Sequence, residues 1–136
     1  MRLPSLPLPL LAAALAAPAV LGCKSQVQFH VRPDDALNEN RPCYLVVRNV
    51  DSKTYLEETY QAASLQVTAP DDSVLETAVV FPGTKKEISV SPPAKGMVAL
   101  YVFFYHPTGD WKAIFPSSEA TYDVVLEGSR LRVEKR

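Results

Sequence analysis

The sequence has few of the residues that enzymes and metalloproteins use for chemistry. Its 136 residues include two histidines, two cysteines and one tryptophan. It has no Gly-rich phosphate loop, no His-Glu-x-x-His pattern, no paired-cysteine motif and no nucleophile elbow. Two adjacent acid pairs, 34–35 and 71–72, lie in turns beside prolines, where Asp is favoured for backbone reasons. The sequence therefore disfavours an enzyme and indicates no catalytic residue, metal site or cofactor.

The chain also lacks a strong bias in charge. It contains 14 Lys and Arg against 15 Asp and Glu, a formal net charge of −1. A nucleic-acid-binding domain would carry a basic stripe or patch. We therefore expect no nucleic-acid partner, and no motif indicates a small-molecule substrate.

The first 22 residues have the features of a signal peptide. Arg2 precedes an uncharged, leucine- and alanine-rich run over residues 6–21, and the small residue Gly22 follows. The run is shorter than the ~20 residues of a membrane span, and three prolines interrupt it. A spanning helix is therefore disfavoured, although an ordinary cleaved signal without lipid remains an alternative.

The end of this leader predicts a lipid anchor. Val20-Leu21-Gly22-Cys23 resembles the lipobox of bacterial lipoproteins, in which the cysteine becomes the acylated first residue. Several acyl chains hold a protein stably at a membrane without a spanning helix. Asp after the cysteine resembles an inner-membrane retention signal, so Lys24 predicts sorting to the periplasmic face of the outer membrane. We expect a leader over 1–22 and one domain over 23–136.

An acylated Cys23 leaves Cys43 without a partner. A leftover cysteine in an exported protein indicates an intermolecular disulfide or a buried thiol. Because Cys43 begins an alternating apolar run, the buried thiol is favoured.

Short alternating segments separated by turn residues predict a mainly β fold. The predicted strands cover residues 27–32, 43–50, 65–69, 74–81, 87–90, 97–105, 111–115, 122–127 and 130–135. Pro82-Gly83 and Gly128-Ser129 supply the residues of tight turns. This pattern predicts a β-sandwich of about eight strands.

One short helix is expected among the strands. Thr54-Tyr55-Leu56-Glu57 matches a capping box, and Leu56, Tyr60 and Ala63 follow at helical spacing. We predict a helix over 55–63. The strand at 97–105 is apolar throughout, so both of its faces need cover. We expect the helix to cover the outer face.

The segment between the first two strands is a candidate binding loop. It runs over residues 33–42 and is longer than the 2–5 residues usual for a hairpin. Long loops on rigid scaffolds often carry function. A solvated loop and a binding loop are both compatible with this sequence.

The order of these features resembles the outer-membrane lipoproteins of type VI secretion systems, the TssJ family. The resemblance rests on the lipobox, the apolar strand with one arginine at 44–50, and the helical segment at 52–65. It also rests on the Pro-Gly turn with basic residues at 81–86, and on the apolar strand 98–104 followed by Trp111-Lys112. Tyr55 and Tyr60 stand where the family usually has phenylalanines.

This resemblance implies a transthyretin-like β-sandwich with one short helical insertion and a structural role. It implies an anchor that ties a trans-envelope complex to the outer membrane by binding the periplasmic domain of the inner-membrane component TssM. In the family the loop between the first two strands makes that contact. By position, this loop comprises Asp34, Asp35, Ala36, Leu37, Asn38, Glu39 and Asn40. Replacing residues 37–39 together with alanine is expected to abolish binding and leave the fold intact.

Two other functions are compatible with an exported β-sandwich. One is a lipoprotein that binds a ligand or acts as a chaperone in the periplasm. The other is a transthyretin-like enzyme of purine catabolism, which would carry a C-terminal Tyr-Arg-Gly-Ser signature and several site histidines. The C-terminal residues 132–136, Arg-Val-Glu-Lys-Arg, have neither feature.

Overall fold

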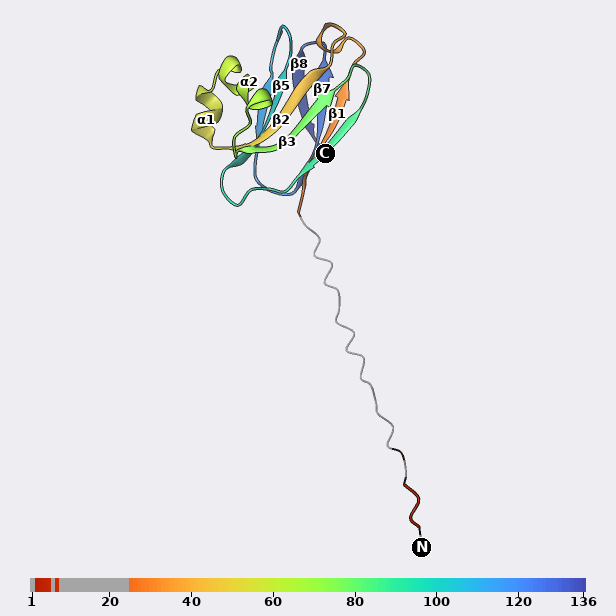
Figure 1. The fold of residues 1–136 in the computed structure, drawn as a ribbon. Coiled ribbons are helices and arrows are strands. Elements are labelled where there is room, and N and C mark those ends of the chain that lie inside the picture. The colour runs from red at the N-terminus through yellow and green to blue at the C-terminus, as the bar shows by residue number, and fades with distance from the viewer. Residues whose placement is uncertain (1, 6, 8–24) are drawn as a thin grey trace.

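The computed structural model describes residues 2–5, 7 and 25–136. Cys23 and Lys24, the predicted lipidation and sorting residues, lie outside these ranges. Residues 27–135 form two four-stranded sheets packed face to face (Figure 1). In the described part of the chain, no helix is long and apolar enough to cross a membrane.

The first sheet has the strand order β4-β1-β7-β8, and the second has the order β3-β2-β5-β6. All neighbouring strands are antiparallel except β1 and β7, which are parallel. The predicted β-sandwich of about eight strands is confirmed. Its strands are β1 Val27–Pro33, β2 Cys43–Val50, β3 Val74–Val80, β4 Lys86–Val90, β5 Met97–Phe103, β6 Lys112–Phe115, β7 Ala120–Glu127 and β8 Arg130–Lys135.

The main core lies between the two sheets. Alternation in β1 turns Val27, Phe29 and Val31 inward, and all three are fully buried. The Phe29 ring packs against Phe115 and Tyr122, with ring centroids 5.1 and 5.8 Å apart. Each fully buried Val, Leu or Phe side chain contributes about 1.5–3 kcal/mol, so this layer provides most of the drive to fold.

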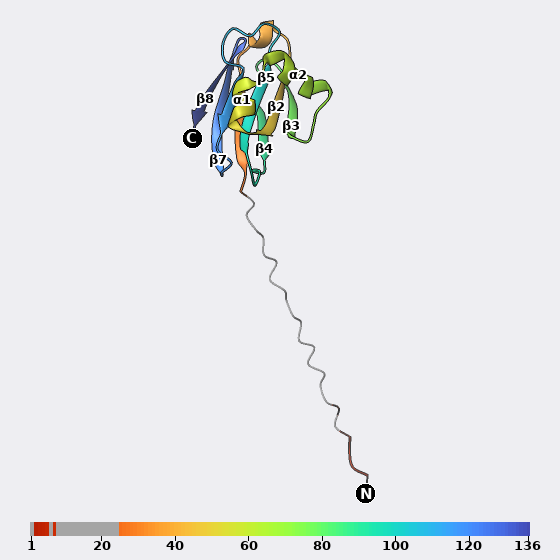
Figure 2. The ribbon, with the colours of Figure 1, turned by 90° about the vertical axis from the view of Figure 1, so that its left-hand side faces the viewer.

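A second, smaller core lies on the outer face of the β3-β2-β5-β6 sheet. Two helices, α1 Ser52–Glu57 and α2 Tyr60–Thr68, cover this face (Figures 1 and 2). Beneath them, Ala99 and Tyr101 of β5 form a buried cluster with Val50 and Ala63, and Tyr55 packs against it. The expectation that helical residues cover the second face of β5 is confirmed.

The helical insertion differs in detail from the prediction. The expected capping box at Thr54 is wrong, because Asp51 caps α1 by accepting a 2.7 Å bond from the Thr54 N–H. That bond holds the pKa of the Asp51 carboxyl below its usual value. Thr59 then starts a second helix by accepting from the Ala62 N–H.

The predicted strand over 65–69 is wrong, because α2 continues to Thr68. β2 already pairs with β3 on one side and β5 on the other, so this segment has no place beside it.

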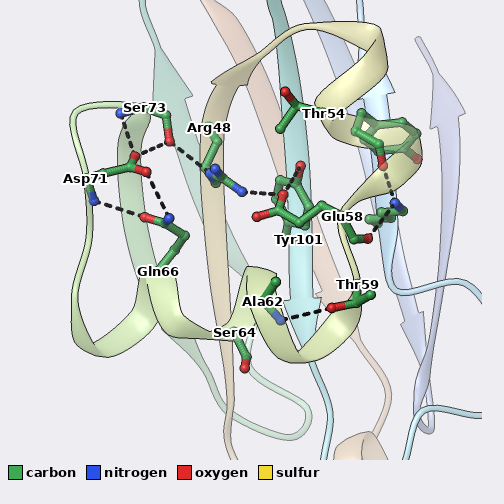
Figure 3. A network of polar contacts seen from close by, with 12 residues as sticks. Arg48, Thr54, Glu58, Thr59, Ala62, Ser64, Gln66, Asp71, Ser73 and Tyr101 are labelled. Atoms are coloured by element: carbon green, nitrogen blue, oxygen red, sulfur yellow. Dashed lines mark hydrogen bonds and ion pairs between the residues drawn. The ribbon is translucent and has the colours of Figure 1, made fainter.

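Arg48 joins the insertion to the sheet. Its side chain is 6% exposed, and its Nη1 lies 2.6 Å from Glu58 Oε2 at the break between the helices. Its Nε donates a 2.9 Å hydrogen bond to Ser73 Oγ just before β3 (Figure 3). The Tyr101 hydroxyl donates to the same Glu58 oxygen at 3.4 Å, and burial raises the pKa of Tyr101 to about 12. One arginine therefore holds the segments before and after α2 against β2.

Cys43 is a buried free thiol, as the sequence favoured. It is 2% exposed, and burial raises the pKa of its thiol to about 12. The thiolate is the reactive form of cysteine, so Cys43 is chemically inert in the folded domain and contributes as a core side chain.

We predict that Arg48→Met lowers the free energy of unfolding by about 3 kcal/mol, because removing one partner leaves the other buried and uncompensated. Arg48→Met combined with Glu58→Leu is expected to recover most of this loss. Urea denaturation measures both effects. Arg130→Met, which breaks an exposed ion pair with Glu127, serves as the control. It should lower the free energy of unfolding by less than about 1 kcal/mol. If Arg48→Met and Arg130→Met lowered the free energy of unfolding equally, the stabilising role of the buried Arg48–Glu58 pair would be contradicted.

Candidate functional site

Strand β1 connects two different ends of the sandwich. Its first residue, Val27, pairs with Val90 and Ala120, directly beside the turns at 91–96 and 116–119. Its last residue, Pro33, leads into the candidate binding loop at the opposite end. We call that opposite end the loop end; it consists of residues 34–42, 81–85, 104–110 and 127–129.

Backbone hydrogen bonds hold the candidate loop against neighbouring segments. The Asp34 carbonyl accepts from the Gly83 N–H at 3.0 Å, and the Asp34 carboxylate accepts from the Gly128 N–H at 3.0 and 3.2 Å. Gly83 has a φ of +67°, and a Cβ there would lie 2.6 Å from Asp35 Oδ1. The Pro82-Gly83 turn predicted from sequence therefore requires its glycine for the positive φ, whereas the exposed Asp35 carboxylate could move aside.

Asn38 is the main positioning residue of the loop. Its Oδ1 accepts a 2.6 Å bond from the Tyr105 N–H, and its Nδ2 donates a 3.0 Å bond to the Pro42 carbonyl. Its own N–H donates to the Gly128 carbonyl at 2.9 Å. The side chain thus replaces the backbone partners that an irregular loop lacks.

The loop contains an unusual backbone segment at this point. Asn38, Glu39 and Asn40 have φ values of 48°, 56° and 62°, so three consecutive non-glycine residues are left-handed. Asn tolerates this region better than most residues, and Glu does so at a cost of about 1–2 kcal/mol. The hydrogen bonds of Asn38 hold the segment in this shape.

Two of the predicted contact residues are buried. Leu37 is 0% exposed and belongs to the main core, and Asn38 is 4% exposed. Replacing both with alanine would damage the fold, so the expectation that a triple variant over residues 37–39 stays intact is wrong. The sequence pattern missed this because an apolar residue in a polar loop fits an exposed anchor and a core anchor equally well.

The other five candidate residues are exposed, namely Asp34, Asp35, Ala36, Glu39 and Asn40. Glu39 Oε2 lies 3.1 Å from His106 Nδ1 and 3.4 Å from Arg41 Nη1. The Arg41 guanidinium also lies over the Tyr105 ring, 4.4 Å from its centroid. The exposed part of the loop is acidic and rests on a small network of side chains.

An exposed apolar patch lies next to the loop and was missed by sequence reasoning. Tyr44 and Val79 face each other across β2 and β3 and are 49% and 40% exposed. Phe81 and Tyr105, just beyond the ends of β3 and β5, are 54% and 61% exposed. The predicted strand 97–105 includes Tyr105, but β5 ends at Phe103. Aromatic side chains exposed beside a rigid loop are typical of protein-binding surfaces.

The chemistry of this end favours binding. Over residues 2–5, 7 and 25–136, no group of three or more His, Cys, Asp or Glu side chains could hold a metal ion. The loop end combines exposed carboxylates with exposed aromatic rings, which suits contact with a protein that carries basic and apolar side chains.

Comparison with known proteins identifies the family. A family model described as the N-terminal domain of IglE matches residues 44–126. The chain belongs to the family of IglE N-terminal domains. The match extends from β2 into β7 and includes the helical insertion. Among curated proteins, none matches the chain significantly.

Solved structures share the fold. TssJ1 from Pseudomonas aeruginosa, a type VI secretion lipoprotein, superposes with a TM-score of 0.68 at 12% identity, covering 83% of this chain and 97% of that one. Serratia marcescens Lip, described as a membrane-bound component of the type VI secretion system, superposes with a TM-score of 0.66 at 15% identity. The match covers 82% of this chain and 98% of that one.

A third match comes from a structure described as the TssM C-terminal domain (869–1107) from EAEC. It gives a TM-score of 0.64 at 13% identity, covering 81% of this chain and 98% of the matched chain. The predicted resemblance to TssJ lipoproteins is confirmed at the level of the fold, and the IglE family match is consistent with it.

We predict that Asn38→Ala destabilises the domain by about 1–3 kcal/mol, because it leaves the Tyr105 N–H and the Pro42 carbonyl without their partner. The loop should become susceptible to limited proteolysis within residues 34–42. Asn40→Gly is the matched control. Asn40 is exposed and has a left-handed backbone conformation, so glycine fits there. The free energy of unfolding should therefore change by less than about 0.5 kcal/mol. A wild-type proteolysis pattern for Asn38→Ala would refute the positioning role.

Proposed function

We propose that this chain is an outer-membrane lipoprotein of a type VI secretion system and that its loop end binds the periplasmic domain of TssM. In this proposal residues 1–22 are a cleaved leader and residues 23–136 form the mature protein. Acylated Cys23 holds the domain at the periplasmic face of the outer membrane, with Lys24 as the sorting residue. In this proposal the protein acts by binding its partner and the membrane.

The observation that carries the proposal is the coverage of the structural matches. The domain superposes on 97–98% of two chains described as type VI secretion components, one a lipoprotein and one membrane-bound. It therefore contains nearly the whole of their fold. The lipobox-like cysteine that precedes this fold supports attachment of the domain to a membrane through lipid.

The third match supports the choice of partner. Because 81% of this chain aligns with 98% of the matched chain, the matched chain is shorter than the present one. The TssM fragment named for that structure, residues 869–1107, is considerably longer. A structure described by its TssM domain thus contains a chain with the fold of this protein, which supports TssM as the partner. A further match, described as a type VI membrane complex, has a TM-score of 0.64 at 11% identity.

The geometry of the loop end supports its assignment as the contact surface. The candidate loop is held in one conformation by Asn38 and Asp34, so binding would order few additional groups. Rigid surfaces lose less conformational entropy on association. The neighbouring exposed apolar patch of Tyr44, Val79, Phe81 and Tyr105 supplies apolar area that a short polar loop alone lacks.

For the anchor, we predict that Cys23→Ser abolishes incorporation of labelled palmitate and releases the protein from the membrane fraction. The test is labelling of cells that express either version, with Cys43→Ser as the control. Cys43 is buried and inert, so its replacement should leave labelling unchanged. Persistent labelling of the Cys23→Ser protein would overturn the lipobox assignment.

For the partner, we predict that Asp35→Arg together with Ala36→Arg reduces binding to the TssM periplasmic domain by at least tenfold. Both side chains are exposed and lie outside the hydrogen bonds that hold the loop, so the fold should be unaffected. Two bulky cations replace an acidic, small surface and introduce charge repulsion and steric overlap.

The matched control introduces two arginines at the opposite end, Ala94→Arg with Ser118→Arg, which are also exposed turn positions. Binding is measured by biolayer interferometry with the lipidated proteins in detergent, and circular dichroism checks the fold. Equal affinities of the two double variants would exclude the loop end as the contact.

A further inference from the structure

We propose that the end of the sandwich opposite the loop end rests directly on the lipid headgroups, so that the domain is held in one orientation. This surface consists of the turns 91–96 and 116–119 together with Ser25 and Gln26, and we call it the membrane end. The inference rests on the proposed acylation of Cys23. It extends that proposal from the presence of an anchor to the surface that the anchor brings to the bilayer.

The folded domain begins very close to the proposed anchor. The Gln26 carbonyl accepts a 3.4 Å bond from the Ala120 N–H, and the Gln26 side chain donates a 3.3 Å bond to Ser91 Oγ. Val27 is already paired with both Val90 and Ala120. The chain is therefore part of the sandwich from Gln26 onward.

The tether that remains is short. Only Lys24 and Ser25 separate Cys23 from Gln26. Three residue-to-residue steps span at most about 11 Å when fully extended. The acyl chains begin in the hydrocarbon core, and the polar headgroup layer on each side of a bilayer is roughly 5–8 Å thick. A tether of this length crosses the headgroup layer with little left over.

The exit of the tether is surrounded by the two turns of the membrane end. Ser25 lines a shallow hollow together with residues of both turns, from Ser91 to Ala94 and from Ser117 to Glu119. Ser117 Oγ donates a 2.6 Å bond to the Gly96 carbonyl and so joins the two turns. Because these turns surround the exit, they reach the headgroups when the tether is drawn to the bilayer.

The charges of the two ends agree with this orientation. The two turns of the membrane end contain a single Lys95 and a single Glu119 among mostly Ser, Pro, Ala and Gly residues. The end of β8 also lies here, because Lys135 pairs with Tyr122 and the Arg136 N–H donates to the Thr121 carbonyl. With these two basic residues added, this end gives no net repulsion from anionic lipid. The loop end carries more acids than bases, and an anionic surface disfavours this negative balance. The acids are Asp34, Asp35, Glu39, Asp110 and Glu127, and the bases are Arg41 and Lys85.

The consequence concerns the loop end. Strand β1 leaves the membrane end and rises about 3.3 Å per residue, roughly 20 Å in all. It therefore places residues 34–42 on the far side of the domain from the bilayer, where a periplasmic partner has free access.

The test places a fluorophore at each end of the lipidated protein in vesicles of phosphatidylethanolamine and phosphatidylglycerol. Ala94→Cys and Ala36→Cys are a matched pair, because both replace alanines in turns at opposite ends of the sandwich. Each is alkylated with a small environment-sensitive dye. Cys43 is 2% exposed and is not alkylated in the folded protein, and acylated Cys23 carries lipid on its sulfur. A lipid with a nitroxide on its headgroup then quenches dyes that lie at the surface.

We expect the Ala94→Cys label to lose most of its fluorescence and the Ala36→Cys label to keep most of it. Insertion of a Gly/Ser linker of about 15 residues between Ser25 and Gln26, with a root-mean-square span of roughly 20 Å, should abolish the difference. Vesicle flotation verifies the anchor in every sample. Equal quenching of both labels in floating protein would overturn this inference and leave the proposed function standing. Failure of the protein to float would overturn both.

Discussion

Burial of β5 on both faces is the constraint on which the arrangement of this domain depends. Its inward residues belong to the core between the sheets, and its outward residues Ala99 and Tyr101 are fully buried beneath the helices. A sheet face of this kind would otherwise expose an apolar surface prone to association. The helical insertion between β2 and β3 supplies the cover, and Arg48 fixes it through its buried pair with Glu58. The Tyr60 hydroxyl of α2 then donates to the Phe104 carbonyl at the loop end. The packing that shields the sheet therefore also supports the segment that carries Tyr105.

The loop end owes its shape to hydrogen bonds that cross between distant parts of the chain. Asp34 bonds to Gly83 and Gly128, and Asn38 bonds to Tyr105 and Gly128. Segments separated by many residues thus meet around one loop and hold three left-handed residues in place. A surface built in this way is preorganised, so little ordering is needed when a partner binds. The exposed acids lie on this rigid support, and the exposed apolar patch lies next to it.

Some of these features were predictable from sequence because they follow from local patterns. The alternation of Val27, Phe29 and Val31 identified β1, and the unbroken apolar run at 97–105 indicated a strand that needs cover on both faces. Other features depend on tertiary context. The division of the insertion into two helices follows from a second cap at Thr59, which the helical spacing did not distinguish from one helix. The burial of Leu37 and Asn38 depends on segments far along the chain, such as those at Tyr105 and Gly128, and no local pattern encodes that proximity.

Two surfaces at opposite ends of a single strand follow from this structure, one beside the proposed lipid anchor and one at the candidate loop. We therefore expect the protein to contact the membrane and TssM at once, through different ends. Photo-crosslinking in intact cells tests this most directly, with benzoylphenylalanine in place of Ala36 or of Ala94. We expect a crosslink to TssM from position 36 and none from position 94. A crosslink to TssM from position 94, with none from position 36, would contradict this arrangement.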